Sequence, residues 1–413
     1  MIKYSTYDFP NGLKLVVHKD ESTPLVAVNI LYRVGSRNES SSKTGFAHLF
    51  EHLMFSGSEN VPDFDMPIQM AGGENNAFTN ADMTNFYNVV PKENLETVLW
   101  VEADRMRALI VDQNNLDVQK KVVIEEFKET CLNQPYGDMW HHMSSTVYKK
   151  HHYNWPTIGK EISHIENATL KDVQAFYANY YQPANSIITI VGNVQAEEIR
   201  DLVGKYFPVE ANKTDSLDIL ICEEEPKQEE YRKKVIRAEV PAEAIFLGFR
   251  MAGRDDEDYF KADLLSDILA NGRSSIFHNK LFKKTDYFTT IDAYVSGTID
   301  PGLLIVEAKI NSERDADKAY DMIWAELELL KEERISDQVV MKLINKIEAA
   351  QVYNEISVLN KAINLSFFTY LGDTELINSQ MKSYEKITAE DLRAYAQRLF
   401  TKENCTEIRY IKN

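Results

Sequence analysis

The sequence predicts an α/β (α+β) protein built from two domains of similar architecture. The chain has 413 residues, which are too many for a single hydrophobic core. Patterns typical of strands and of helices alternate along it, and their order recurs after a polar, acidic segment. That segment, residues 213–232, contains the run Glu223-Glu224-Glu225 and is the best candidate for a linker. We therefore expect homologous domains at residues 1–212 and 233–413.

The composition is that of a globular protein with an excess of acid. Hydrophobic residues make up 44% and charged residues 27%, and 64 acidic against 46 basic residues leave a net charge of −18. This balance disfavours nucleic acid and anionic membrane as partners, and no apolar run is long enough to span a bilayer. The three cysteines, Cys131, Cys222 and Cys405, form no C-x-x-C pair and indicate a reducing compartment. The N-terminus resembles no signal peptide, so a cytoplasmic location is expected; a periplasmic one would follow if a signal segment had been removed.

The elements of the first half follow from hydrophobic periodicity and from turn residues. Strands are expected at Leu13–His18, Leu25–Tyr32, Asn76–Asn80, Thr84–Val90 and Ser186–Val191. Helices are expected within 45–55 and at Phe64–Met70, Pro91–Ile110, Asp117–Thr130, Leu170–Tyr180 and Ala196–Tyr206.

The second half repeats this order. Strands are expected at Lys234–Ala238, Ile245–Met251, Phe288–Val295, Leu303–Ile310 and Glu407–Ile411. Helices are expected at Tyr259–Ala270, Ser275–Lys284 and Ala389–Phe400, and between Asp315 and Leu371.

The stretch around which the chain is organised is Gly-Phe-Ala-His-Leu-Phe-Glu-His-Leu-Met-Phe at residues 45–55. On a helix, residues three and four apart share a face, so His48, Glu51 and His52 project together. Two imidazoles at this spacing suit zinc, and a neighbouring carboxylate can deprotonate a water on the metal. The pattern His-x-x-Glu-His is the inverted form of the zinc-protease helix motif. The alternative, a buried helix with two hydrogen-bonded histidines, is less favoured.

A catalytic zinc needs a third protein ligand, which must come from elsewhere in the chain. The expected helix Asp117–Thr130 offers Glu125, Glu126 and Glu129 beside an apolar face. Val122, Val123, Ile124 and Phe127 are expected to point inward from that face. Glutamates on helices are usually solvated, so spacing alone leaves the three open.

The motif and several segments after it resemble the pitrilysin (M16) family of zinc peptidases. Besides residues 45–55, the matching segments are Gly-Gly-Glu-Asn-Asn-Ala-Phe-Thr at 72–79, Gln-Lys-Lys-Val-Val-Ile-Glu-Glu at 119–126 and Tyr-Gln-Pro-Ala-Asn at 181–185. The length suits the short-chain branch, which includes bacterial peptidases resembling mitochondrial processing peptidase. The resemblance implies that each domain holds a mixed, mainly antiparallel sheet packed with helices. It also implies that the two domains form half of a clamshell and that the C-terminal domain lacks a metal site.

The resemblance also implies roles for particular residues. His48, His52 and Glu126 become the ligands of one Zn²⁺ per chain, and Glu51 becomes the general base of a zinc endopeptidase that cleaves peptides or unfolded segments in an enclosed chamber. Glu125 and Glu129 remain lesser candidates for the third ligand. The stretch Asn76, Ala77, Phe78 and Thr79 resembles an edge strand to which an extended peptide substrate adds.

Two departures from the family pattern concern activity. Gln119 stands where the family usually has a glutamate behind the metal ligands, so a charge is lost while hydrogen bonding is retained. Phe282 and Thr289 stand where family members that act alone have an arginine and a tyrosine. Lys283, Lys284 or Tyr287 substitute only after a shift of the alignment, so we expect a homologous subunit, in a homodimer or a heterodimer, to supply the pair. The alternatives are a zinc-bearing subunit that is inactive without its partner and a non-hydrolytic assembly subunit.

Overall fold

The computed structural model describes residues 1–208, 222–333 and 335–413. Contacts divide the chain into two compact units, each discontinuous in sequence. Unit 1 consists of residues 1–127, 155–223 and 351–378, and unit 2 of residues 128–154, 224–350 and 379–413. Each unit thus takes a segment from the half of the sequence that otherwise forms the other unit. The expected domain boundaries stay a prediction, and residues 213–221 of the expected linker lie outside the described residues.

Unit 1 is organised on a six-stranded sheet with the order β1-β2-β6-β3-β5-β4. The β2–β6 pair is parallel and the other pairs are antiparallel. Its strands are β1 (Ser5–Asp8), β2 (Lys14–Lys19), β3 (Leu25–Tyr32), β4 (Glu74–Thr79), β5 (Thr84–Pro91) and β6 (Ser186–Gly192).

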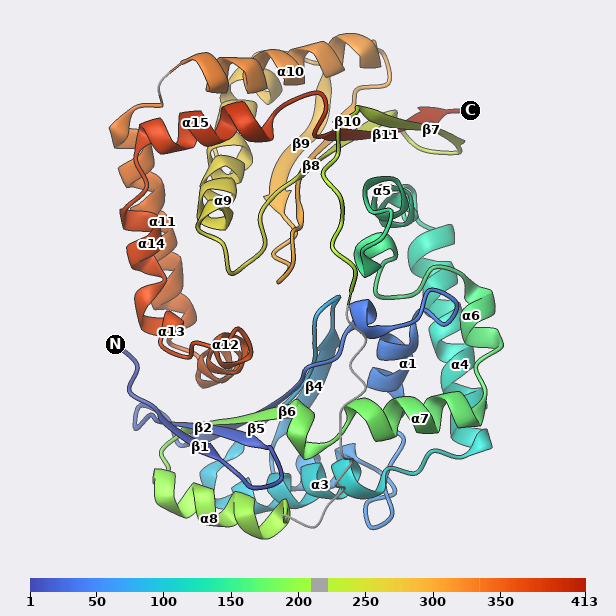
Figure 1. Cartoon of the computed structure of the whole chain (residues 1–413), viewed down its shortest axis with the longest axis vertical. Helices are drawn as coiled ribbons and strands as arrows, with labels where there is room; N and C mark the ends of the chain where they lie inside the picture. Colours follow the sequence, from blue (N-terminus) through green and yellow to red (C-terminus); the bar gives the residue numbers. More distant parts are fainter. Residues whose placement is uncertain (209–221, 334) are drawn as a thin grey trace. The chain divides into compact units, whose positions relative to one another are not determined.

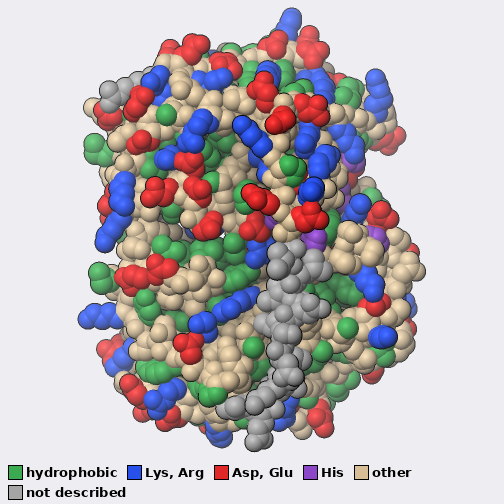
Figure 2. Space-filling model, in the orientation of Figure 1, with side chains coloured by type: hydrophobic (Ala, Val, Ile, Leu, Met, Phe, Trp, Pro, Cys, Tyr) green, Lys and Arg blue, Asp and Glu red, His purple; other side chains and the backbone are tan. Residues whose placement is uncertain are grey.

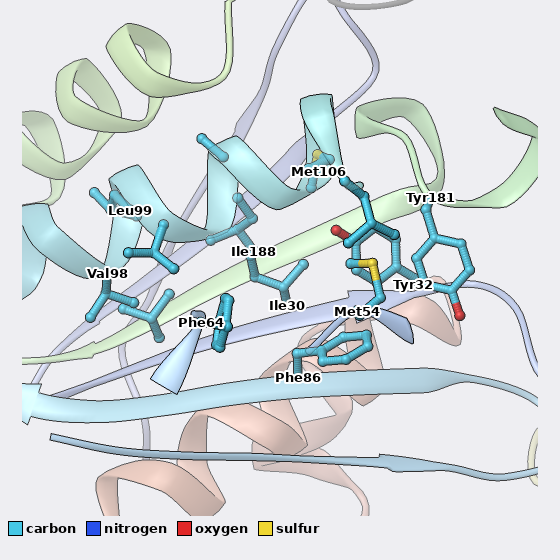
Figure 3. Packing of buried hydrophobic residues seen from close by; sticks show 14 of the residues in the cluster. Ile30, Tyr32, Met54, Phe64, Phe86, Val98, Leu99, Met106, Tyr181 and Ile188 are labelled. Carbon is cyan, nitrogen blue, oxygen red and sulfur yellow. The ribbon is translucent and has the colours of Figure 1, made fainter. Parts of the chain in front are cut away.

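One face of this sheet carries the main core of unit 1. Alternate residues of β3, such as Val28, Ile30 and Tyr32, pack there against helices, as expected from the two-residue period of a strand. Figure 3 shows Ile30, Phe86 and Ile188 of the sheet on the side where Val98 and Leu99 pack. The helices of unit 1 are α1 (Phe46–Leu53), α2 (Asp65–Met70), α3 (Leu95–Ala108), α4 (Gln113–Phe127), α6 (Ile162–Glu166), α7 (Leu170–Tyr180), α8 (Ala196–Tyr206) and α12 (Val358–Tyr370).

The other face is covered by α12, which comes from the second half of the sequence. Figure 1 shows α12 on the side of the sheet opposite to α3 and α8. Leu365 and Ala362 are fully buried against Ala27 and Leu31, the intervening residues of β3. Because both faces of β3 are covered, the strand consists almost entirely of buried residues.

Polar contacts fix the position of α12 on the sheet. Ser366 accepts a hydrogen bond from Asn29 (2.7 Å) and donates one to Thr189 (2.8 Å), and all three side chains are fully buried. Near the start of the helix, Lys361 forms an ion pair with the largely buried Asp20. These buried groups are satisfied only when the helix sits at this position, which gives the packing a defined register.

Unit 2 repeats the architecture with a five-stranded sheet of order β7-β11-β8-β10-β9. The β7–β11 pair is parallel and the others are antiparallel. Its strands are β7 (Arg232–Ala238), β8 (Ala244–Arg250), β9 (Phe288–Val295), β10 (Leu303–Ile310) and β11 (Cys405–Lys412).

The helices of unit 2 include α5, from the first half of the sequence, which packs on β7, β8 and β11. They are α5 (Met139–Val147), α9 (Glu257–Ala270), α10 (Ala316–Glu332), most of α11 (Asp337–Asn354), α14 (Met381–Glu385) and α15 (Ala389–Leu399). In the sequence, α13 (Leu376–Ser379) spans the point where unit 1 ends and unit 2 resumes. The expectation of mixed, mainly antiparallel sheets packed with helices is confirmed in both units.

Charged side chains of both signs lie on the surface. On the face shown in Figure 2, acidic and basic side chains are interspersed over both parts of the view. Among the described helices, none is long and apolar enough to cross a membrane.

Candidate metal centre

The first helix of unit 1 has two chemically different sides. Phe46, Leu49, Phe50 and Leu53, at helical spacing, are buried in the main core. Phe50 stacks on Tyr181, with ring centroids 4.8 Å apart. The side chains of His48, Glu51 and His52 lie on the remaining side, where each is partly exposed. The apolar side therefore holds the helix, and the polar side is left for chemistry.

The helix begins at a glycine because the chain turns sharply and closely there. Gly45 has a φ of +85°, which residues with a side chain rarely adopt. A Cβ at this position would lie 2.9 Å from the carbonyl oxygen of Ile158. Glycine also offers no side chain to cap the first N–H groups of the helix, which must be satisfied from elsewhere.

Glu39 provides that cap from outside the helix. Its carboxylate accepts hydrogen bonds from the backbone N–H groups of Gly45 (2.9 Å) and Ala47 (2.8 Å) and from the indole of Trp155 (3.0 Å). The side chain is almost completely buried, and burial raises the pKa of Glu39 to about 8, although the N–H donors favour the charged form. Sequence reasoning missed this residue, because it lies in a polar loop six residues before the N-cap Gly45, outside the usual capping positions.

The candidate for the third metal ligand comes from α4. Val123 and Phe127 are buried and anchor this helix, which packs on α1. Val122 was expected to point inward, but it is 44% exposed, because the buried stripe of α4 runs through Leu116, Val123 and Phe127. With this orientation, Glu126 faces α1.

The structure brings His48, His52 and Glu126 together. The two Nε2 atoms are 3.2 Å apart, and Oε2 of Glu126 lies 3.6 Å from Nε2 of His48 and 3.4 Å from Nε2 of His52. A tetrahedral zinc with bonds of about 2.0–2.2 Å separates its ligand atoms by roughly 3.3–3.6 Å. The three atoms therefore form a triangle of the size that zinc requires, with a donor set that zinc prefers. The residues present fit the metal.

The surroundings of the triangle favour the protonation states in which its side chains can bind a metal. Burial lowers the pKa of His48, and the hydrogen bond with His52 lowers the pKa of Glu126, so the imidazole tends to be neutral and the carboxylate charged. Nδ1 of His48 is buried and has no hydrogen-bond partner among the described residues. The orientation of this ring therefore depends on packing, without the outer hydrogen bond that often orients a ligating histidine.

Glu51 lies between the triangle and strand β4. Burial raises its pKa, while a hydrogen bond from the Thr79 side chain opposes that shift. Thr79 is the last residue of β4, which packs on α1. The carboxylate next to the histidines is thus close to the end of the strand.

Strand β4 lies at the edge of the sheet, so one side of its backbone has no strand beside it. The N–H of Asn80 bonds to the carbonyl of Met83, which makes Phe78–Asn85 and Asn76–Tyr87 the hydrogen-bonded pairs of the ladder. The N–H of Ala77 therefore points away from β5, and it donates to the Asn76 side chain instead (2.8 Å).

The remaining predicted site residues occupy different surroundings. Gln119 donates to the hydroxyl of Ser56, just beyond α1, over 3.4 Å. Glu125 is exposed, and Glu129, which belongs to unit 2, accepts a hydrogen bond from Asn133. Among the described residues, only His48, His52 and Glu126 form a group of metal-binding side chains.

Comparison with known proteins places these features in context. Residues 14–161 match the family model described as Insulinase (Peptidase family M16), and residues 167–347 match that of the Peptidase M16 inactive domain. The chain is 28% identical to Zinc protease PqqE of Helicobacter pylori over 98% of this chain and 92% of that protein. It is 22% identical to a probable mitochondrial-processing peptidase subunit beta of Arabidopsis thaliana, over 83% of this chain and 65% of that one.

A solved structure supports the same relationship. The crystal structure of a protease from Helicobacter pylori superposes with a TM-score of 0.94 at 28% identity, covering 99% of each chain.

Replacing Glu39 by glutamine tests its role at the start of α1. The amide turns an N–H₂ group toward donors that need an acceptor, so we expect the free energy of unfolding to fall by about 1–3 kcal/mol. Zinc affinity, measured by competition with a chromogenic chelator, should fall as well, because the helix that carries both histidines loses its cap. Glu93→Gln, the same change at an exposed site, is the control. Equal melting temperatures for Glu39→Gln and Glu93→Gln would contradict the role.

Proposed function

We propose that this chain, which belongs to the M16 family of peptidases, is a zinc-dependent endopeptidase in which His48, His52 and Glu126 hold one zinc ion. The observation that carries the proposal is the triangle of ligand atoms, whose edges of 3.2, 3.4 and 3.6 Å match a tetrahedral zinc. Three protein ligands leave a fourth position for water or substrate, as catalytic zinc sites do.

When bound, zinc supplies a Lewis acid that polarises a carbonyl and makes water more acidic. Glu51 is the general base of the proposal. It precedes the ligand His52 directly, and its carboxylate lies near Thr79 at the end of β4. From that position it takes a proton from the attacking water and later returns it to the leaving amine.

The free side of β4 supports recognition of an extended peptide. We infer that residues Asn76, Ala77, Phe78 and Thr79 form the strand to which the substrate adds, because the outward N–H of Ala77 is the kind of donor that strand addition uses. The Asn76 side chain accepts that hydrogen bond in the free protein and has to move when a substrate carbonyl replaces it. Backbone pairing recognises an extended main chain more than particular side chains, so unfolded segments are suitable substrates.

Gln119 modifies this site without removing its chemistry. Its contact with Ser56 links α4 to the end of α1 by an uncharged hydrogen bond. A glutamate at this position would add a negative charge behind the ligands, so we infer that the present chain holds its metal with less negative charge nearby.

A second homologous subunit is part of the proposal. Phe282 is 42% exposed, and the Thr289 hydroxyl donates to the carbonyl of Lys309 (3.1 Å), so neither offers a cation to a substrate. The relative from Arabidopsis thaliana is named as a subunit, and we infer that this chain also works as a pair, with itself or with a related chain.

Replacing Glu51 by glutamine should abolish peptide cleavage while zinc stays bound. Loss of a general base lowers turnover by about 10²–10⁴-fold. A quenched-fluorescent peptide reports turnover, and metal analysis after dialysis reports zinc. Glu125→Gln, a change of the same kind on the exposed side of α4, should leave both unchanged. Cleavage by Glu51→Gln at the rate of the unaltered protein would remove Glu51 from the mechanism.

Replacing Ala77 by proline should impair substrate binding selectively. Proline deletes the outward N–H without deleting a ladder hydrogen bond, and edge strands tolerate it. We expect KM to rise severalfold while zinc content and melting temperature change little. Ala77→Val keeps the N–H and is the control. Unchanged KM in Ala77→Pro would argue against strand addition at β4.

Native mass spectrometry of the purified chain, with metal content measured on the same sample, tests the need for a partner. We expect a dimer of this chain, or a complex with a related one, and one zinc for each chain that carries the triangle. Full peptidase activity of a monomer would contradict the inferred pairing.

A further inference from the structure

A second, separate feature of unit 1 is a cavity of about 290 Å³ on the face of the sheet that α12 covers. Its polar lining includes Thr6 and Asp8 of β1, Lys14 of β2, Arg33 just after β3, and Thr369 and Tyr370 at the end of α12. All of these residues belong to the same compact unit.

The strand register explains why these side chains meet. Thr6 pairs with Val16, and Asp8 pairs with Lys14, so all four point to one face of the sheet. Val16 packs in the cluster that contains α12, which identifies that face. Arg33 follows Ala27 and Leu31 of the same cluster at even spacing, and its N–H bonds to the carbonyl of Asn185 at the end of the neighbouring strand.

Arg33 is a partly buried cation without an acidic partner. Its Nε is buried and has no hydrogen-bond partner among the described residues, and none of the ion pairs there includes its guanidinium. Burial lowers the pKa of Arg33, but arginine is so strong a base that the side chain remains charged at any ordinary pH. A buried N–H without an acceptor is unfavourable, and a charged one more so.

Other buried cations of unit 1 have acidic partners. Arg105 forms a 2.8 Å pair with Glu102, Arg37 a 3.2 Å pair with Asp82, and Lys361 pairs with Asp20. Asp8, the acid of the cavity lining, acts on Arg33 only through its charge, because its ion pair is with Lys14 at 2.8 Å and its side chain is 78% exposed.

The other titratable groups of the lining leave the guanidinium available. The Tyr370 hydroxyl accepts from Arg37 (2.9 Å) and donates to the carbonyl of Asp82 (3.1 Å), so it is fully engaged. Lys14 adds a second positive charge to the lining. The summed charge of Arg33, Lys14 and Asp8 is +1.

We propose that this cavity is a binding site for an oxyanion, a carboxylate or a phosphate group, which Arg33 binds through its planar guanidinium. Arginine matches both groups with two parallel hydrogen bonds, and a partly buried site strengthens them. The site is separate from the metal centre. It lies at the β1–β2 edge, opposite to β4, and on the face of β3 turned away from the core that holds α1. The proposal does not depend on the peptidase function.

Isothermal titration with sodium phosphate, and separately with sodium acetate, at constant ionic strength set by sodium chloride, tests the site. We expect the zinc-loaded protein to bind at least one of the two anions. Arg33→Met keeps the length of the side chain and removes the charge, so binding should weaken by about tenfold or more. Arg33→Lys keeps the charge but loses the planar guanidinium, so its affinity for the anion should lie between those of the unaltered protein and Arg33→Met. Arg200→Met removes an exposed charge and is the control.

Thermal unfolding in chloride buffer provides the readout that distinguishes a ligand site from a structural arginine. Because Arg33 has no acidic partner, Arg33→Met should melt at the same temperature or higher without anion, and phosphate or acetate should no longer raise it. Absence of binding by either anion would overturn the proposal. Equal binding by Arg33→Met and by the unaltered protein would also overturn it, because the anion would then bind at the metal or at another site. So would a lower melting temperature of Arg33→Met in chloride.

Discussion

The candidate site depends on one constraint, that the short helix α1 must be held by one side so that the other presents its two histidines together. Eight residues are too few for a helix to be stable alone, so its stability comes from packing and capping. Phe46, Leu49, Phe50 and Leu53 provide the packing, and Glu39 satisfies the N–H groups at its start. The 3.2 Å separation of the two imidazole nitrogens follows from this fixation together with the four-residue spacing of the histidines.

Much of the fold could be predicted because local periodicity is strong where elements are long. Helix α7 was expected at Leu170–Tyr180 and α8 at Ala196–Tyr206, and both have these bounds. The four-residue strand β1 was not anticipated, because a partly exposed edge strand has little hydrophobic pattern. Val122 was placed wrongly, because neighbouring valines on α4 compete for one buried stripe and sequence alone does not show where that stripe begins.

Long-range arrangement was beyond the reach of local patterns. The sequence indicates two halves, whereas the packing gives α12 to unit 1 and α5 to unit 2. The reason is that a sheet with two apolar faces needs helices packed on both of them. Any amphipathic helix of the chain can pack on the second face. For the same reason the histidine pair could be found from its spacing, whereas Glu39, which acts across a loop, and Arg33, whose surroundings come from three separate segments, could not. The choice of Glu126 among three glutamates came from the family resemblance, and the orientation of α4 supports it.

The lack of an ion pair at Arg33 is informative because this protein has an excess of acidic residues. With 64 acidic against 46 basic residues, a carboxylate partner for a partly buried arginine is easy to provide, and Arg37, Arg105 and Lys361 each have one. Asp8, in the same cavity lining, is turned to Lys14 instead. Since an arginine without a partner costs stability and a methionine of similar length would not, the arrangement is understandable if the missing acceptor comes from outside the chain. An acidic surface repels anions at long range, so the affinity of the cavity must arise from direct contact with the guanidinium rather than from the field of the whole protein.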